Sequence, residues 1–179
     1  MLTTMIVALA AVAAPLAVFP QDSTVPPPPL PRSEPAPPTP EQRHYVEGLR
    51  SVARGAAQLR DGIDRVSRTQ QSADSARQRL AGRRLGGLCT TARSFMSSGR
   101  PRMQPNAYAD SMRIVARQLV VRIDSVLKFL PICETTAGKK PASVAADLLN
   151  RMRGYETALA AFRAGLLARM DSVKTATQQ

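Results

Sequence analysis

The stretch that decides the fold is YVEGLRSVARGAAQLRDGIDRV, residues 45–66. Its apolar side chains recur in alternating steps of four and three residues, which places them on one face of an α-helix. They are Tyr45, Leu49, Val52, Ala56, Leu59, Ile63 and Val66. The pattern predicts an amphipathic helix that buries this face, with Pro40 and Glu41 in its first turn.

The polar run SRTQQSADS, residues 67–75, predicts a turn into a second helix. Because no Gly or Pro marks this turn, one long helix through Leu85 is the alternative. In this second helix, the apolar residues expected to face inward fall in two phases, following first one helical register and then another. Gly86-Gly87 lies near the change of register and favours a kink there, since glycine lowers helix stability by about 1 kcal/mol. The first phase is Ala73, Ala76 and Leu80, and the second is Ala81, Leu85, Leu88, Ala92 and Phe95.

Two further helices are expected after the loop at residues 97–105, the first capped by Asn106 and ended by Pro131, the second starting after Lys139-Lys140-Pro141. The inward residues of the first are Tyr108, Met112, Val115, Leu119, Ile123, Val126 and Leu130. Those of the second are Ala145, Leu148, Met152, Tyr155, Leu159, Phe162, Leu166, Met170 and Val173. Without any strand pattern, residues 42–179 are predicted to form an all-α, antiparallel four-helix bundle with up-down-up-down topology.

An apolar run of fifteen residues, 5–19, precedes these helices. It is shorter than the roughly 20 residues that span a bilayer, so residues 1–19 are predicted to be a signal peptide or an N-terminal membrane anchor. No Lys or Arg occurs before Arg32, which leaves a buried cytosolic segment as the alternative. The export reading predicts a periplasmic or secreted protein, tethered to the membrane if the segment is retained.

Residues 20–41 hold ten of the fifteen prolines. Proline removes backbone donors and favours extended polyproline II at about 3.1 Å per residue, which predicts a disordered linker. Its PPPPLP motif could instead dock in an aromatic groove of a partner.

The composition excludes several classes of function. One histidine and two cysteines cannot supply both a catalytic triad and a zinc site, and the chain has no Trp on which nucleic acid bases could stack. Neighbouring carboxylates are expected to form surface ion pairs at helical spacing, as in Asp61 with Arg65, Asp64 with Arg68, and Asp147 with Arg151. We therefore expect no enzyme, no cofactor and no nucleic acid partner.

His44 takes part in two weak patterns. Glu41 and His44 have the Glu-x-x-His spacing of di-metal bundles, but no second such pair exists. His44 and Met170 would meet at one end of an antiparallel bundle, as haem ligands could, yet the heptad places His44 on the outer flank and only Met170 inward. A surface histidine is the favoured interpretation.

Cys89 and Cys133 make an even count in a chain predicted to be exported, which favours an intrachain disulfide. A simple hairpin turning near residue 102 opposes it, because the two cysteines would then lie about 27 Å apart along the bundle. The alternatives are a second helix broken at Gly86-Gly87, free thiols, or a bond between two chains.

The net charge of +12 is the strongest functional signal, and half of it lies in residues 69–105. The candidate binding residues are Arg77, Arg79, Arg83, Arg84, Arg93, Arg100 and Arg102. Arginine presents a planar fork suited to phosphate and carboxylate, although an arginine-rich composition can also simply solvate helix faces.

These observations favour an exported, non-enzymatic interaction module that docks through its arginine-rich helix. The expected partner is an anionic membrane surface, an envelope polymer or an acidic protein, and a membrane complex could include this chain as a subunit. The alternatives are a small-ligand or haem carrier that uses the bundle core and a structural assembly subunit.

Overall fold

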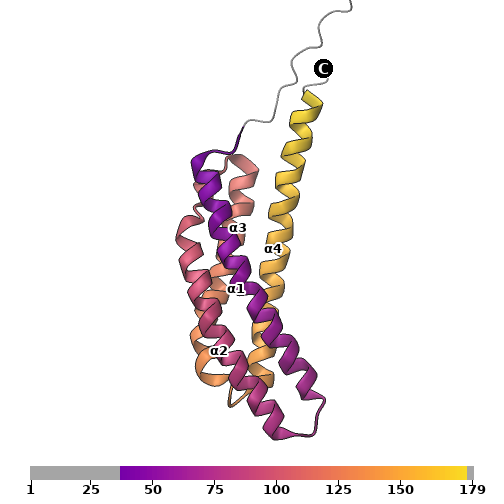
Figure 1. Ribbon diagram of the computed structural model, residues 1–179. Helices are drawn as coiled ribbons and strands as arrows, with labels where there is room; N and C mark the ends of the chain where they lie inside the picture. Colours follow the sequence, from indigo (N-terminus) through magenta and orange to yellow (C-terminus); the bar gives the residue numbers. More distant parts are fainter. Residues whose placement is uncertain (1–36, 177–179) are drawn as a thin grey trace, which may run out of the picture. The chain divides into compact units, whose positions relative to one another are not determined.

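The computed structural model describes residues 37–176, and side chains as far as Asp171. The predicted signal or anchor segment and most of the predicted linker lie outside the described residues. Four helices pack antiparallel to their chain neighbours, which confirms the all-α four-helix bundle (Figure 1). They are α1 (Pro40–Gln70), α2 (Ser75–Gly99), α3 (Asp110–Thr136) and α4 (Pro141–Ala176), with short 3-10 turns η1 (Arg100–Arg102) and η2 (Pro105–Ala107) between α2 and α3.

The start of α1 is fixed by a reciprocal cap. The Thr39 hydroxyl accepts a hydrogen bond from the Gln42 backbone N–H, and the Gln42 side chain accepts one from the Thr39 N–H. Pro40 suits the first helical position because its missing donor is not needed there. The helix therefore begins two residues inside the predicted linker, and six of the seven predicted inward residues are fully buried, with Leu49 partly buried.

The turn between α1 and α2 falls where the polar run predicted it. α1 ends at Gln70, and Asp74 caps α2 by accepting from the N–H groups of Ala76 and Arg77, so the single long helix is wrong. The first inward phase of α2 is also wrong, because Ala73, Ala76 and Leu80 are exposed. α2 continues through Gly86-Gly87 as one helix.

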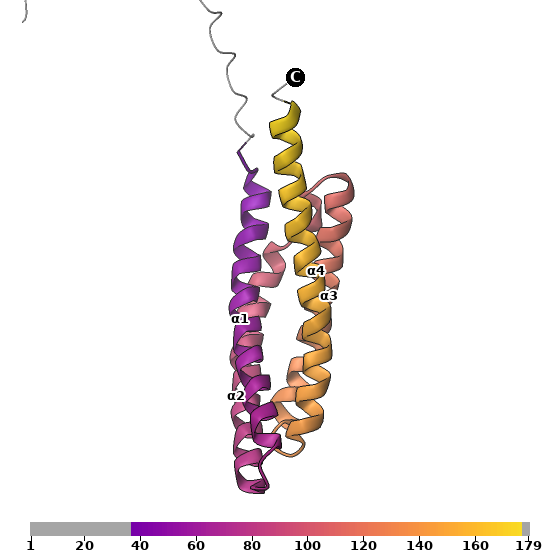
Figure 2. The ribbon, with the colours of Figure 1, turned by 90° about the vertical axis from the view of Figure 1, so that its right-hand side faces the viewer.

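The exposed first phase has a geometric cause. Gly82 lies against Ala137 and Pro141, which flank the α3–α4 turn. Everything before Gly82 in α2 extends beyond that turn, where no second layer can cover it. The α1–α2 hairpin accordingly protrudes past the α3–α4 connection (Figures 1 and 2). We call this protruding end, residues 65–84, the hairpin tip.

Three glycines spaced seven residues apart bring α1 close to α2. A Cβ on Gly48 would lie 2.5 Å from the carbonyl oxygen of Gly99, and one on Gly55 would lie 2.8 Å from that of Ala92. A Cβ on Gly62 would lie 2.6 Å from the Leu85 side chain. Gly48 and Gly55 therefore require glycine for close backbone approach, whereas at Gly62 the nearest α2 backbone atom is 3.8 Å away and the Leu85 side chain would have to shift.

The connection between α2 and α3 runs along the bundle instead of turning back at once (Figure 2). Arg100 pairs with Asp124, which lies fourteen residues into α3, so α2 ends about 20 Å below the start of α3. α3 begins at Asp110 after Ala109, and the predicted cap Asn106 belongs to η2. The prediction that Pro131 ends this helix is wrong: α3 continues to Thr136, with Pro131 on an exposed face.

This rising connection brings the two cysteines level. From the Arg100–Asp124 pair, Cys89 is eleven residues back along α2 and Cys133 nine residues forward along α3. Their Cα atoms are 6.2 Å apart and the disulfide forms within one chain. The geometric objection from a hairpin centred near residue 102 is therefore wrong, and both cysteines are fully buried.

At the end of the bundle opposite the hairpin tip, three aromatic side chains pack together. Tyr45, Tyr108 and Phe162 meet with ring centroids 5.1 to 5.4 Å apart. The Tyr45 hydroxyl donates to the main-chain oxygen of Ala116 at 3.1 Å, and burial raises the pKa of this tyrosine. Past Phe162, α4 has no fully buried described residue, and Met170 is 51% exposed, so its predicted inward placement is wrong.

The glycine contacts predict opposite effects for two identical substitutions. Gly55→Ala should lower the free energy of unfolding by about 1–3 kcal/mol, because the new methyl group collides with the α2 backbone. Gly87→Ala should raise it by about 0.5–1 kcal/mol, since nothing lies within 4 Å of its added Cβ and alanine favours the helix. Urea unfolding followed by circular dichroism measures both, and equal shifts would contradict the close α1–α2 contact.

Removal of the disulfide should be costly. The bond closes a sequence separation of 44 residues, for which the loss of unfolded-chain entropy is worth about 4 kcal/mol. The double variant Cys89→Ala/Cys133→Ala should lose roughly this amount in urea unfolding. An unchanged midpoint and slope would show that the bond does not constrain the unfolded chain.

Candidate anion-binding site

The seven arginines singled out by the sequence divide into two groups. Three of them bind carboxylates on other elements of the bundle, and four lie at the hairpin tip. The first group is Arg93, Arg100 and Arg102, and the second is Arg77, Arg79, Arg83 and Arg84. The structure therefore does not bring all seven into one surface.

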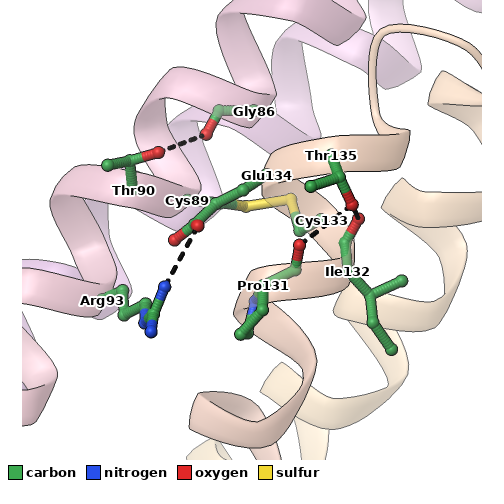
Figure 3. A network of polar contacts seen from close by, with 9 residues as sticks. All are labelled: Gly86, Cys89, Thr90, Arg93, Pro131, Ile132, Cys133, Glu134 and Thr135. Carbon is green, nitrogen blue, oxygen red and sulfur yellow. Dashed lines mark hydrogen bonds and ion pairs between the residues drawn. A yellow bond between two sulfur atoms is a disulfide. The ribbon is translucent and has the colours of Figure 1, made fainter.

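The first group supports the fold. Arg100 donates from Nε and Nη2 to the two carboxylate oxygens of Asp124 at 2.6 and 2.9 Å, and these hydrogen bonds raise its pKa. Arg93 pairs with Glu134 at 3.2 Å directly beside the disulfide (Figure 3). Arg102 approaches Glu47 of α1 at 3.8 Å. Since their charge is compensated, these three are poor candidates for binding a ligand.

The second group keeps most of its charge uncompensated. Arg77 pairs through Nε, at 3.2 Å, with Asp74, the N-cap residue of its own helix. Arg79, Arg83 and Arg84 form no ion pair with any residue between 37 and 171. The predicted anion-binding role can therefore rest only on this end of α2.

A hollow of about 300 Å³ gathers part of this charge at the hairpin tip. Helical spacing places three side chains of α1 and four of α2 on the two facing sides of the groove between these helices. We call it the arginine pocket, and it is lined by Arg65, Arg68, Thr69, Arg77, Leu80, Ala81 and Arg84. Four arginine side chains thus line the hollow together with Leu80 and Ala81, and its lining contains no carboxylate.

Two members of the pocket, Arg65 and Arg68, were not among the predicted site residues. The sequence assigned them to ion pairs with Asp61 and Asp64, but neither pair forms in the described part of the chain. Arg68 instead donates from Nε to the main-chain oxygen of Asp64 at 3.3 Å. The predicted connection at residues 67–75 could have identified both arginines. The last helical turn before a tight connection and the first helical turn after it must lie side by side.

Two other hollows differ in their charge. One of about 430 Å³ lies between Arg83 and Lys139, and Glu134 is part of its lining. A wider one of about 960 Å³ between α3 and α4 includes Asp147, and its Arg151 is already bound to Ser125 at 2.9 Å. Of the three, the arginine pocket is the one whose lining contains only positive charge.

The predicted metal and haem patterns gain no support from the geometry. His44 is exposed, as its heptad position predicted, and Met170 is largely exposed as well. In the part of the chain that the structure describes, no three His, Cys, Asp or Glu side chains gather as metal ligands. None of the described helices is long and apolar enough to cross a membrane.

Comparisons with known protein families, curated proteins and solved structures found no match for this chain. Its function is therefore inferred from its own residues. The buried disulfide indicates an oxidising, extracytoplasmic environment, because thiols stay reduced in the cytosol.

The two groups of arginines should respond differently to neutralisation. Arg100→Gln should lower the free energy of unfolding by about 1–2 kcal/mol, because it removes a bidentate, half-buried contact with Asp124. Arg83→Gln should change it by less than about 0.5 kcal/mol, since that side chain is exposed and makes no described ion pair. Thermal unfolding of both variants measures this. A comparable loss in Arg83→Gln would give the tip arginines a structural role.

Proposed function

We propose that this chain is an extracytoplasmic, non-enzymatic docking module whose hairpin tip binds an anionic partner. The observation that carries the proposal is the arginine pocket, whose lining includes four arginines from two helices and no carboxylate. Their mutual repulsion is unfavourable in the free protein, and a bound anion would relieve it. Such a site is more easily explained by binding than by solvation of a helix face.

The chemistry of the pocket suits recognition by fixed charge. Arginine stays protonated throughout the physiological pH range, and its fork of N–H donors matches phosphate and carboxylate oxygens. Arg68 donates from Nε to the main-chain oxygen of Asp64, and Arg77 pairs through Nε with the N-cap residue Asp74, so both side chains are restrained by their own ends of the hairpin. The expected partners are those named from the sequence: an anionic membrane surface, an envelope polymer or an acidic protein.

The proposed location follows from the disulfide and from the sequence before α1. An oxidising compartment agrees with export directed by residues 1–19, and a periplasmic or secreted protein is the form we propose. If the apolar segment is retained, the proline-rich linker provides about 60 Å of reach between it and the bundle.

Binding to a soluble polyanion tests this function without involving lipid. The full chain should bind heparin, and its affinity should fall roughly tenfold or more between 50 and 500 mM NaCl as the charges become screened. Replacement of Arg65, Arg68, Arg77 and Arg84 by Gln should weaken binding about fivefold for each arginine removed. Titration by fluorescence anisotropy with labelled heparin measures both effects.

A matched control separates the pocket from net charge. The quadruple variant with Gln at Arg50, Arg54, Arg117 and Arg153 loses the same charge from exposed positions outside the pocket. It should weaken heparin binding clearly less. Equal losses in the two variants, or an affinity independent of salt, would refute the proposed function.

A further inference from the structure

The arginine pocket contains apolar residues as well as charged ones. On α2, Leu80 lies between Arg77 and Arg84 at helical spacing, and this leucine is 42% exposed. Ala81, beside it, belongs to the core and forms part of the same lining. A ligand that carried charge alone would leave Leu80 in contact with water, whereas an apolar group in the pocket would cover it. The pocket therefore suits a ligand that presents an apolar group next to anionic groups.

The pocket offers few groups that suit a sugar. Thr69 is its one uncharged polar residue, and its hydroxyl donates to the main-chain oxygen of Val66 at 2.9 Å. The lining contains no aromatic side chain. A polysaccharide presents many hydroxyl groups, which lose free energy when they leave water without new hydrogen bonds. An envelope polymer could pair its anionic groups with the arginines, but it would gain nothing from Leu80.

The position of the pocket is unfavourable for a flat anionic surface. The hairpin ends in the turn at residues 71–74, where Asp74 is exposed. A bilayer that approached the hairpin end-on would meet this carboxylate before it reached Leu80. Arg79 and Arg83 do not line the pocket, so they do not widen its charged surface. The site is therefore a local one, confined to the groove between α1 and α2.

The size of the pocket limits what can enter it. Its volume of about 300 Å³ lies at the lower end of the range for ligand sites. This is room for one apolar side chain together with the carboxylates that flank it. Arg65 and Arg68 line the pocket from α1, and Arg77 and Arg84 line it from α2, so acidic groups on either side of the inserted side chain have partners on both helices.

We infer that the partner is a protein that inserts an apolar side chain, flanked by acidic residues, into the arginine pocket. The apolar side chain covers Leu80, and the flanking carboxylates pair with the arginines of α1 and α2. This inference rests on the proposed function and selects the acidic protein among its partners. A polypeptide places an apolar side chain and carboxylates within a few residues of each other, and an anchor of this kind in a small pocket is typical of protein interfaces.

A pair of acidic peptides tests the apolar contact. The fluorescein-labelled peptides GDEDLDEDG and GDEDADEDG carry the same charge and differ only in the central leucine or alanine. The full-length protein should bind the leucine peptide about fivefold to tenfold more tightly, because the larger side chain removes more apolar surface from water. Fluorescence anisotropy at low salt measures both affinities.

The variant Leu80→Gln locates this preference in the pocket. It keeps all four arginines, so the ratio of the two peptide affinities separates the leucine contact from any change in electrostatic attraction. The ratio should fall to about twofold or less. Ile132→Gln is the matched control, because Ile132 is an exposed apolar residue of α3 outside the pocket, and its ratio should equal that of the unaltered protein.

The outcomes separate the two proposals. Equal affinities for the two peptides, or a preference that persists in Leu80→Gln, would refute the inserted apolar side chain, while salt-dependent heparin binding through the pocket would keep the docking function. Binding to vesicles of phosphatidylglycerol without binding to either peptide would also overturn the inference. If the protein binds neither the peptides, nor heparin, nor the vesicles, the docking function fails as well.

Discussion

The close approach of α1 to α2 is the constraint on which the rest of the structure depends. Gly48 and Gly55 let the two backbones meet where a side chain would collide with a carbonyl oxygen of α2, and Gly62 leaves room for the Leu85 side chain. Because this contact repeats along the hairpin, α1 and α2 form a stiff pair that does not need the other two helices at every level. The pair extends beyond the α3–α4 turn, and the arginine pocket lies between its two helices near that end.

The two ends of the bundle have different roles for the same reason. At one end, Tyr45, Tyr108 and Phe162 pack together and the Tyr45 hydroxyl is satisfied by α3. At the other end, most side chains of the hairpin tip are exposed, although Val66 and Ala81 still belong to the core. The exposed arginines of the tip therefore lie outside the core and can meet a partner.

The sequence predicted the number of helices, their order and most of the core. Burial of one helix face requires apolar residues at every third or fourth position, and this spacing can be recognised in the sequence. It was wrong wherever the answer depended on how far one helix extends past another. Leu80 and Met170 fit the period but lie at levels where no neighbour covers them. The argument against the Cys89–Cys133 disulfide failed for the same reason. It counted residues from a tight turn near residue 102, whereas the α2–α3 connection runs along the bundle before α3 begins.

The candidate site was predicted in part. The tip arginines of α2 were identified as an excess of charge, but the same excess included Arg93, Arg100 and Arg102, whose carboxylate partners lie far away in sequence. Arg65 and Arg68 were missed because their charge was assigned to local pairs on α1. Gly48, Gly55 and Gly62 drew no prediction, although their spacing of seven residues matches the repeat of the apolar face.

The disulfide also changes what a break in the main chain would do. The segment between α2 and α3 exposes Pro101, Arg102, Gln104 and Asn106, and it lies between the two cysteines in sequence. A protease that cut there would produce two fragments still joined through sulfur, each keeping its partner helix. Outside the cytosol, where such enzymes are abundant, the nicked molecule would stay assembled and would separate only when a reductant is added.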